Sequence, residues 1–445
     1  LWSDPMSEIS RRQWLQSTLS APWLAPLGGL ATANWAPPVA AQGTPGVPPR
    51  LLSRPPRAKL PVAAICTVYH RASHADVIVG KILEGWQQAG GPGPDLRVAA
   101  MYVDQFPETD LSRELSARHG FPIVSRIDEA LTLGTGRLQV AGVLSIGEHG
   151  NYPHDPVTGQ HQYPRRRFFD AIADTFERCG QVAPVFNDKH LSWNYADALA
   201  MVERARQLEI PLLAGSSLPV AWRMPQLVLP RDCEVEAALS IGYGGLESYG
   251  FHALEMHACQ LERRRGGETG LRALRTVPAA ELLEAGRQGE WSQKLFAAAR
   301  AVMPGAPRDT DAWQPGEGSG AFVLEHRDGL RSAVVMANGL AGHFSCAFQL
   351  KGVAEPVACW FKLQEGAPFG HFAYLLRAIE ESIHSRRAAY PVERTLWTTG
   401  VLDRAQQSAA QGGRRLETPE LNFGWQPVDW PHANAADSPL AIPSD

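Results

Sequence analysis

The stretch PVAAICTVYHRASHADVIVGKIL, residues 61–83, decides the fold class of this 445-residue chain. Residues 62–68 form an apolar run that predicts a buried strand, and residues 72–88 have the spacing of an amphipathic helix. A strand that leads directly into a helix opens a Rossmann-type nucleotide-binding domain, in which a glycine-rich loop normally holds the phosphates. Residues 66–71 contain no glycine. The junction therefore predicts a Rossmann-like scaffold with an altered phosphate loop.

The alternation of apolar strand and helix continues to residue 217. Further strands are expected at residues 97–103, 122–124, 140–146, 184–186 and 211–215. Such alternation is typical of a parallel sheet covered by helices on both faces. After residue 217, strand-like runs follow one another with few helices between them. We therefore predict an α/β chain: a Rossmann-like dinucleotide-binding domain at 59–217, and an α+β substrate and oligomerisation domain at 218–445 with a large, mostly antiparallel open sheet.

Composition narrows the class of protein. Hydrophobic residues make up 44% of the chain and charged residues 20%, as in soluble globular proteins. The formal net charge of −4 argues against a nucleic-acid partner, because no basic excess is available to neutralise phosphates. The six cysteines form no CxxC pair and are expected to be buried free thiols. No apolar run is long enough to cross a membrane.

The N-terminal residues have the order of an export signal. Arg11 and Arg12 precede a weakly apolar run that ends in the small residues Val39-Ala40-Ala41. Paired arginines, an apolar segment and a small-residue cleavage site predict twin-arginine export to the periplasm or the exterior. Residues 1–41 are the predicted signal segment, and the proline-rich residues 42–58 are the predicted linker.

Reactive side chains follow several of the predicted strands, where the carboxyl ends of a parallel sheet bring them to one edge. Lys189 comes directly after a buried strand and is flanked by acid and imidazole groups, so it is expected to be partly desolvated and suited to proton transfer or carbonyl polarisation. His252 lies near the start of a predicted helix and is a candidate proton carrier, with Glu247 or Ser248 expected to orient it. The strand-end residues are His70, His74, Asp104, Glu148, His149, Asp188, Lys189 and His190.

Three blocks of sequence resemble the glucose–fructose oxidoreductase, inositol dehydrogenase and rhizopine-catabolism family (Gfo/Idh/MocA). Residues 97–104 with the following HGFP are similar to the second strand of the family and its acidic ribose-binding position. Residues 185–191, VFNDKHL, match the spacing of the family segment V-x-x-E-K-P-L, and GFHALE at 250–255 is similar to G-V-H-x-x-D. The resemblance covers about residues 59–420.

The resemblance implies a bound NAD or NADP and hydride transfer with a sugar or cyclitol-like substrate between the two domains. Lys189 would take the place of the lysine that bonds the reacting hydroxyl, His252 that of the general acid–base, and Glu247 that of the acid that precedes the histidine. In the phosphate loop, side chains stand where the family has glycines. The candidate cofactor-binding residues are Thr67, His70, Asp104, Glu148 and Asp188.

Two other classes of function remain open from the residues. A metal-assisted lyase or hydrolase would use imidazole and carboxylate ligands, and the i,i+4 spacing of His70 and His74 would place both on one helical face. Its candidate ligands are His70, His74, Glu148, His149 and His190. A non-catalytic sugar-binding protein would use aromatic side chains such as Tyr249. An open sheet with one bare apolar face also predicts a homo-oligomer.

Overall fold

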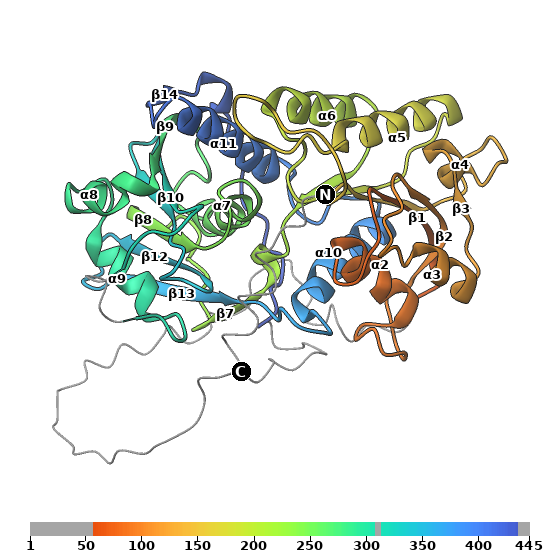
Figure 1. Cartoon of the computed structure of the whole chain (residues 1–445), viewed down its shortest axis with the longest axis horizontal. Coiled ribbons are helices and arrows are strands. Elements are labelled where there is room, and N and C mark those ends of the chain that lie inside the picture. Colours follow the sequence, from red (N-terminus) through yellow and green to blue (C-terminus); the bar gives the residue numbers. More distant parts are fainter. Residues whose placement is uncertain (1–56, 308–312, 435–445) are drawn as a thin grey trace, which may run out of the picture. The chain divides into compact units, whose positions relative to one another are not determined.

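The computed structural model describes residues 57–307 and 313–434. The predicted signal segment, residues 1–41, and residues 42–56 of the predicted linker lie outside the described residues. Strands and helices alternate as far as residue 215, and a second run of strands follows (Figure 1). Among the described residues, no helix is long and apolar enough to cross a bilayer.

The first sheet has six parallel strands in the order β3-β2-β1-β4-β5-β6. Its elements are β1 (Leu60–Cys66), α2 (His74–Glu84), β2 (Leu96–Val103), α3 (Ser112–His119), β3 (Ile123–Val124), α4 (Ile127–Thr132), β4 (Gly142–Ile146), α5 (Arg165–Cys179), β5 (Val185–Asp188), α6 (Tyr195–Gln207) and β6 (Leu212–Gly215). Across the sheet, successive strands are added on one side from β1 to β3 and on the other side from β4 to β6. The strand order therefore reverses between β1 and β4. In sheets of this kind, ligands bind beyond the carboxyl ends of the strands at that reversal.

Strand β1 is apolar throughout because both of its faces are covered. Val62, Ala64 and Cys66 pack with α2 and with α10 (Gly370–Ser385), whereas Ala63 and Ile65 pack with α4 and α5. The predicted Rossmann-like parallel sheet is confirmed. Helix α10 comes from the second half of the chain and lies against α2, so the C-terminal segment helps to cover the first sheet.

The second sheet has eight strands in the order β14-β9-β10-β11-β8-β12-β13-β7, and only the β8–β11 pair is parallel. The predicted mostly antiparallel sheet is therefore confirmed. Its elements are β7 (Trp222–Met224), β8 (Val235–Gly242), α7 (Ser248–Leu261), β9 (Leu271–Pro278), α8 (Leu282–Arg287), α9 (Gln293–Ala301), β10 (Gly320–His326), β11 (Arg331–Met336), β12 (Phe344–Leu350), β13 (Val357–Lys362), α11 (Glu393–Ala410) and β14 (Leu416–Glu417).

The expectation that one apolar face of this sheet is uncovered is wrong. Alternate residues of β10 point to opposite faces: Phe322 and Leu324 pack with α7, and Ala321 and Val323 pack with α8 and α9. Helices of the same chain thus cover both faces (Figure 1). The homo-oligomer remains a prediction, but an exposed apolar sheet face no longer supports it.

Helix α11 ties the two sheets together at the edge where the reactive side chains lie. Thr399 Oγ1 accepts the Leu191 N–H at 3.1 Å, and Thr395 Oγ1 donates to the Ala214 carbonyl at 3.1 Å. Thr398 Oγ1 donates to Glu255 of α7 at 2.7 Å. One helix therefore positions the loop after β5, the end of β6 and the helix that carries His252.

Candidate active site

Three strand ends and one helix of the second half of the chain bring polar side chains together. His74 begins α2 after β1, Glu148 follows β4, Asp188 ends β5, and Lys189 comes next. The His252 ring centroid lies 6.3 Å from that of His74. The structure therefore places Lys189 and His252, predicted from separate blocks of sequence, in one buried group.

Lys189 is held by a tight turn. Its backbone φ of +60° lies in the left-handed region, which costs a non-glycine residue of order 1 kcal/mol. The Asn187 side chain donates to the carbonyls of Asp188 (3.2 Å) and His190 (3.1 Å), and the Lys189 N–H donates to Gly215 O at 3.2 Å. These bonds fix the turn and so direct the ammonium group toward Glu148, with which it forms an ion pair.

Glu148 is the centre of the charged group. Its side chain is 8% exposed and lies 3.0 Å from His74 Nδ1, 3.7 Å from His149 Nε2 and beside the Lys189 ammonium. Burial by itself raises the pKa of a carboxyl group, but His74, Lys189 and His149 together hold the pKa of Glu148 well below its usual value. Glu148 is therefore ionised and balances the charge of the buried Lys189 ammonium.

His252 is a partly buried, neutral imidazole. Burial, and then the charges of Lys189 and His74, hold its pKa well below the usual value. Its Nδ1 lies 2.6 Å from Ser216 Oγ, and that hydroxyl also accepts the Leu218 N–H at 3.1 Å. The bond to Ser216 fixes the ring and leaves Nε2 as the nitrogen that can exchange a proton.

Glu247 does not orient this ring. Its Oε1 accepts the backbone N–H of His161 at 2.8 Å, so it fastens the long loop that follows β4. The orienting group expected from the sequence is instead Ser216, which follows β6 at the same sheet edge. Sequence reasoning missed Ser216, although its position directly after the last parallel strand is the same signal that identified the other strand-end candidates.

Arg165, also missed from the sequence, is completely buried beneath this group. Its Nη1 donates to His190 Nε2 at 2.8 Å. Burial and the guanidinium hold the pKa of His190 well below its usual value. Within the described residues, several buried polar atoms at the ends of β4 and β5 have no hydrogen-bond partner in the protein, which indicates bound water or ligand. These atoms are Ser145 Oγ, Glu148 Oε2, Gln160 Oε1, Arg165 Nε and Nη2, Asn187 Oδ1, His190 Nδ1 and Ser192 Oγ.

The expected metal-ligand set is only partly assembled. Ser73 caps α2 by accepting the Asp76 N–H at 3.3 Å, so the helix begins at His74, and the expectation that His70 and His74 share a helical face is wrong. His190 Nε2 is already hydrogen-bonded to Arg165 Nη1 and so is not available as a metal ligand. His74 and Glu148 do come together, with Asp188 as the third member: His74 Nδ1 lies 2.7 Å from Asp188 Oδ2.

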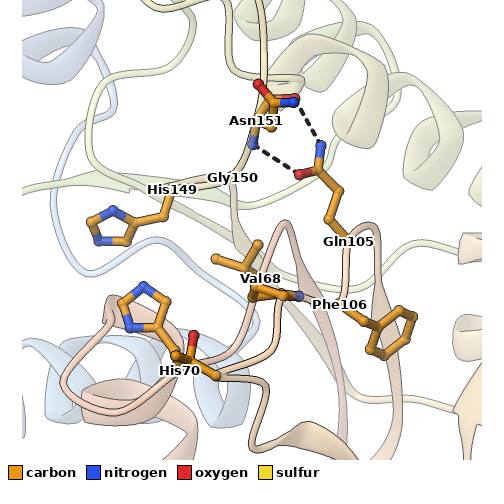
Figure 2. A pocket seen from close by; sticks show the side chains of 9 residues that line it. Val68, His70, Gln105, Phe106, His149, Gly150 and Asn151 are labelled. Atoms are coloured by element: carbon orange, nitrogen blue, oxygen red, sulfur yellow. Dashed lines mark hydrogen bonds between the residues drawn. The ribbon is translucent and has the colours of Figure 1, made fainter. Parts of the chain in front are cut away.

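A pocket of about 450 Å³ opens beyond the ends of β1, β2 and β4. Figure 2 shows the imidazoles of His70 and His149 on one side of it, with ring centroids 5.1 Å apart. On the other side, the Gln105 amide bonds the backbone of Asn151 in both directions, at 2.8 and 3.0 Å. Phe106 lies at the rim. The pocket is at the reversal of the strand order, where a Rossmann-like sheet receives a nucleotide.

The position and lining of this pocket fit one end of a dinucleotide, held by side chains rather than by glycine amides. Of the expected cofactor residues, His70 lines the pocket. Thr67 is fully buried and its hydroxyl donates to the Glu148 carbonyl. Asp104 accepts from Tyr152 and Arg167, each at 2.7 Å, so a ribose hydroxyl would have to compete for it. Glu148 and Asp188 belong to the charged group described above.

Solved structures similar to this chain were found, although no protein-family model and no curated protein matches the sequence. GenD2 from gentamicin A biosynthesis, solved in complex with NAD, is 13% identical with a TM-score of 0.52, over 84% of this chain and 99% of that one. A probable dehydrogenase from Thermotoga maritima is 12% identical (TM-score 0.49; 81% of this chain and 100% of that one), and scyllo-inositol dehydrogenase from Lactobacillus casei is 9% identical (TM-score 0.48; 81% and 98%). The similarity to GenD2 shows a shared fold. The chain thus has the fold of the Gfo/Idh/MocA dehydrogenases, and the resemblance drawn from its sequence is confirmed at that level.

Proposed function

We propose that this chain is an oxidoreductase that transfers hydride between a tightly held NAD or NADP and a sugar or cyclitol-like substrate. The observation that carries the proposal is the meeting of Lys189 and His252 in one buried group beside Glu148. The fold shared with GenD2, a protein crystallised with NAD, supports it. When bound, the nicotinamide ring would accept or return the hydride.

The side chains divide the remaining work between them. The Lys189 ammonium would donate a hydrogen bond to the reacting oxygen of the substrate and stabilise negative charge there as the hydroxyl proton leaves. His252, neutral because burial lowers its pKa, would take that proton at Nε2 during oxidation of an alcohol and return it during reduction of a carbonyl. Glu148 would hold the Lys189 ammonium in place through their ion pair.

Tyr249 provides a wall suited to a polyhydroxylated ring. It is 40% exposed, and its ring centroid lies 6.1 Å from that of His252. An exposed aromatic face beside a proton-transfer group suits stacking against the C–H face of a sugar. By contrast, Trp222 is fully buried in the core and cannot stack on a substrate.

The test has two parts, binding and turnover. Protein purified after cytoplasmic folding should release a nicotinamide dinucleotide on denaturation, and a panel of sugars and cyclitols should change its absorbance at the reduced-nicotinamide band. Lys189→Met and His252→Gln should each reduce turnover by about 10²-fold or more while the dinucleotide is retained. Lys294→Met and His119→Gln, which alter exposed or half-exposed groups remote from the site, serve as matched controls. Protein that carries no dinucleotide and binds none would overturn the proposal.

We propose also that the protein is exported through its twin-arginine segment. Export of an already folded chain is consistent with a cofactor acquired in the cytoplasm. A reporter fused after residue 41 should reach the periplasm, and Arg11→Lys with Arg12→Lys should hold it in the cytoplasm. A reporter that stays inside with the native segment would refute export.

A further inference from the structure

We propose that His74, Glu148 and Asp188 form a binding site for one divalent transition-metal ion such as Mn²⁺ or Zn²⁺. Each residue offers one ligand atom, and these atoms all lie within 4.8 Å of one another. The inference goes beyond hydride transfer, since the proposed reaction requires no metal. It also does not depend on whether a dinucleotide binds.

The spacing of the ligand atoms matches a metal coordination sphere. His74 Nδ1 lies 2.7 Å from Asp188 Oδ2 and 3.0 Å from Glu148 Oε2. Adjacent ligands of an octahedral ion with bonds of about 2.1 Å are separated by about 3.0 Å. The three atoms can therefore surround one ion with small side-chain movements. Three protein ligands would leave open positions for water or substrate.

Hydrogen bonds within the protein do not satisfy all the polar atoms of these three side chains. A single N–H at His74 Nδ1 can donate well to one acceptor, and Asp188 Oδ2 is the nearer of the two. Glu148 Oε2 is consequently buried with no hydrogen-bond partner in the protein. A buried carboxylate oxygen without a donor costs about 1–3 kcal/mol or more. An ion in place of the His74 proton would satisfy both carboxylates at once.

The ligand chemistry selects the class of metal. One imidazole and two carboxylates suit Mn²⁺, Fe²⁺, Co²⁺ or Zn²⁺, and the absence of sulfur among these three ligands argues against Cu⁺. Glu148 would use Oε2 for the ion while Oε1 stays with the Lys189 ammonium. The ion would then lie next to the group that contacts the substrate oxygen, and its open positions could receive neighbouring hydroxyls of a polyol.

The experiment uses the full-length protein and the metal ion alone. After treatment with a chelator, the protein is titrated with Mn²⁺ and free Mn²⁺ is followed by electron paramagnetic resonance. We expect one ion per chain, and electron spin-echo modulation from a coordinated imidazole nitrogen. His74→Gln should remove that modulation, and Asp188→Asn and Glu148→Gln should each weaken binding at least about tenfold.

Glu247→Gln is the matched control, because it neutralises a partly buried carboxyl at the same edge that is not one of the three ligands. It should leave the affinity for Mn²⁺ unchanged. Saturating Mn²⁺ or Zn²⁺ should also raise the unfolding temperature of the unaltered protein, a measurement that remains valid if a ligand variant fails to fold. The proposal is overturned if the unaltered protein binds no ion at millimolar Mn²⁺ or Zn²⁺, or if binding persists equally in the three ligand variants.

Discussion

The Lys189–Glu148 ion pair gives the sharpest test of the structure in the absence of a known substrate. The perturbation is a double-mutant cycle with Lys189→Met and Glu148→Gln, which preserve length while removing charge. The two side chains are 9% and 8% exposed. Two unit charges about 4 Å apart interact by about 4 kcal/mol at an effective dielectric constant near 20. Removing one partner of a buried pair typically costs about 3–5 kcal/mol, since the other charge stays buried.

The structure also ranks the two single variants. In Lys189→Met, Glu148 still faces His74 at 3.0 Å and His149 at 3.7 Å, so the expected loss of unfolding free energy is about 3 kcal/mol. In Glu148→Gln, the Lys189 ammonium loses its ion-pair partner, so about 4 kcal/mol is expected. Because the double variant buries neither unpaired charge, it should lose about 4 kcal/mol instead of the additive 7, a coupling of about 3 kcal/mol.

The assay is urea unfolding at neutral pH, followed by circular dichroism and tryptophan fluorescence, whose coincidence checks for a single transition. The control cycle uses Lys294 and Glu355, an exposed pair 3.2 Å apart, for which coupling below about 1 kcal/mol is expected. A Lys189–Glu148 coupling no larger than that of the control would refute the buried ion pair.

Three further predictions concern residues around the site. Burial lowers the pKa of His371 to about 3, so between that value and pH 6.5 the unfolded chain binds a proton at this residue and the folded chain does not. The free energy of unfolding should therefore fall as the pH is lowered. In unfolding measured from pH 6.5 to 4.5, His371→Asn should reduce that fall by about 1.4 kcal/mol per pH unit. Gly215→Ala should destabilise by about 3 kcal/mol in thermal unfolding, because φ is +122° and an added Cβ would lie 2.6 Å from a buried carboxylate oxygen; Gly305→Ala, in open space, should cost under about 1 kcal/mol. Ser216→Ala should cost about 1–3 kcal/mol by leaving Nδ1 of the partly buried His252 unpaired, and an unchanged unfolding temperature would contradict that contact.

The positions of the parallel strands along the chain could be predicted because most of them are apolar runs bounded by polar turns. The start of α2 was predicted too early. Ser73 and Asp76 have the S-x-x-D spacing of a helix start, a local signal that places His74 at the first turn and His70 outside the helix. The gathering of reactive groups at one sheet edge also followed from topology, because parallel strands all end there.

Contacts between separate elements could not be predicted in this way. The bond from Ser216 to His252 joins β6 to α7, and nothing in either segment specifies the other. The packing of α8 and α9 on the second sheet likewise could not be predicted. Periodicity shows that each helix has an apolar side, but not which surface of the protein that side covers. The same holds for α10, which crosses to the first sheet.

Native mass spectrometry of the full-length protein, purified from the cytoplasm before export, addresses the central claim most directly. One chain with the mass of a single nicotinamide dinucleotide added is the predicted species, and a chelator should leave that added mass in place. A bare polypeptide, still bare after incubation with NAD and with NADP, would contradict a redox enzyme built around Lys189 and His252.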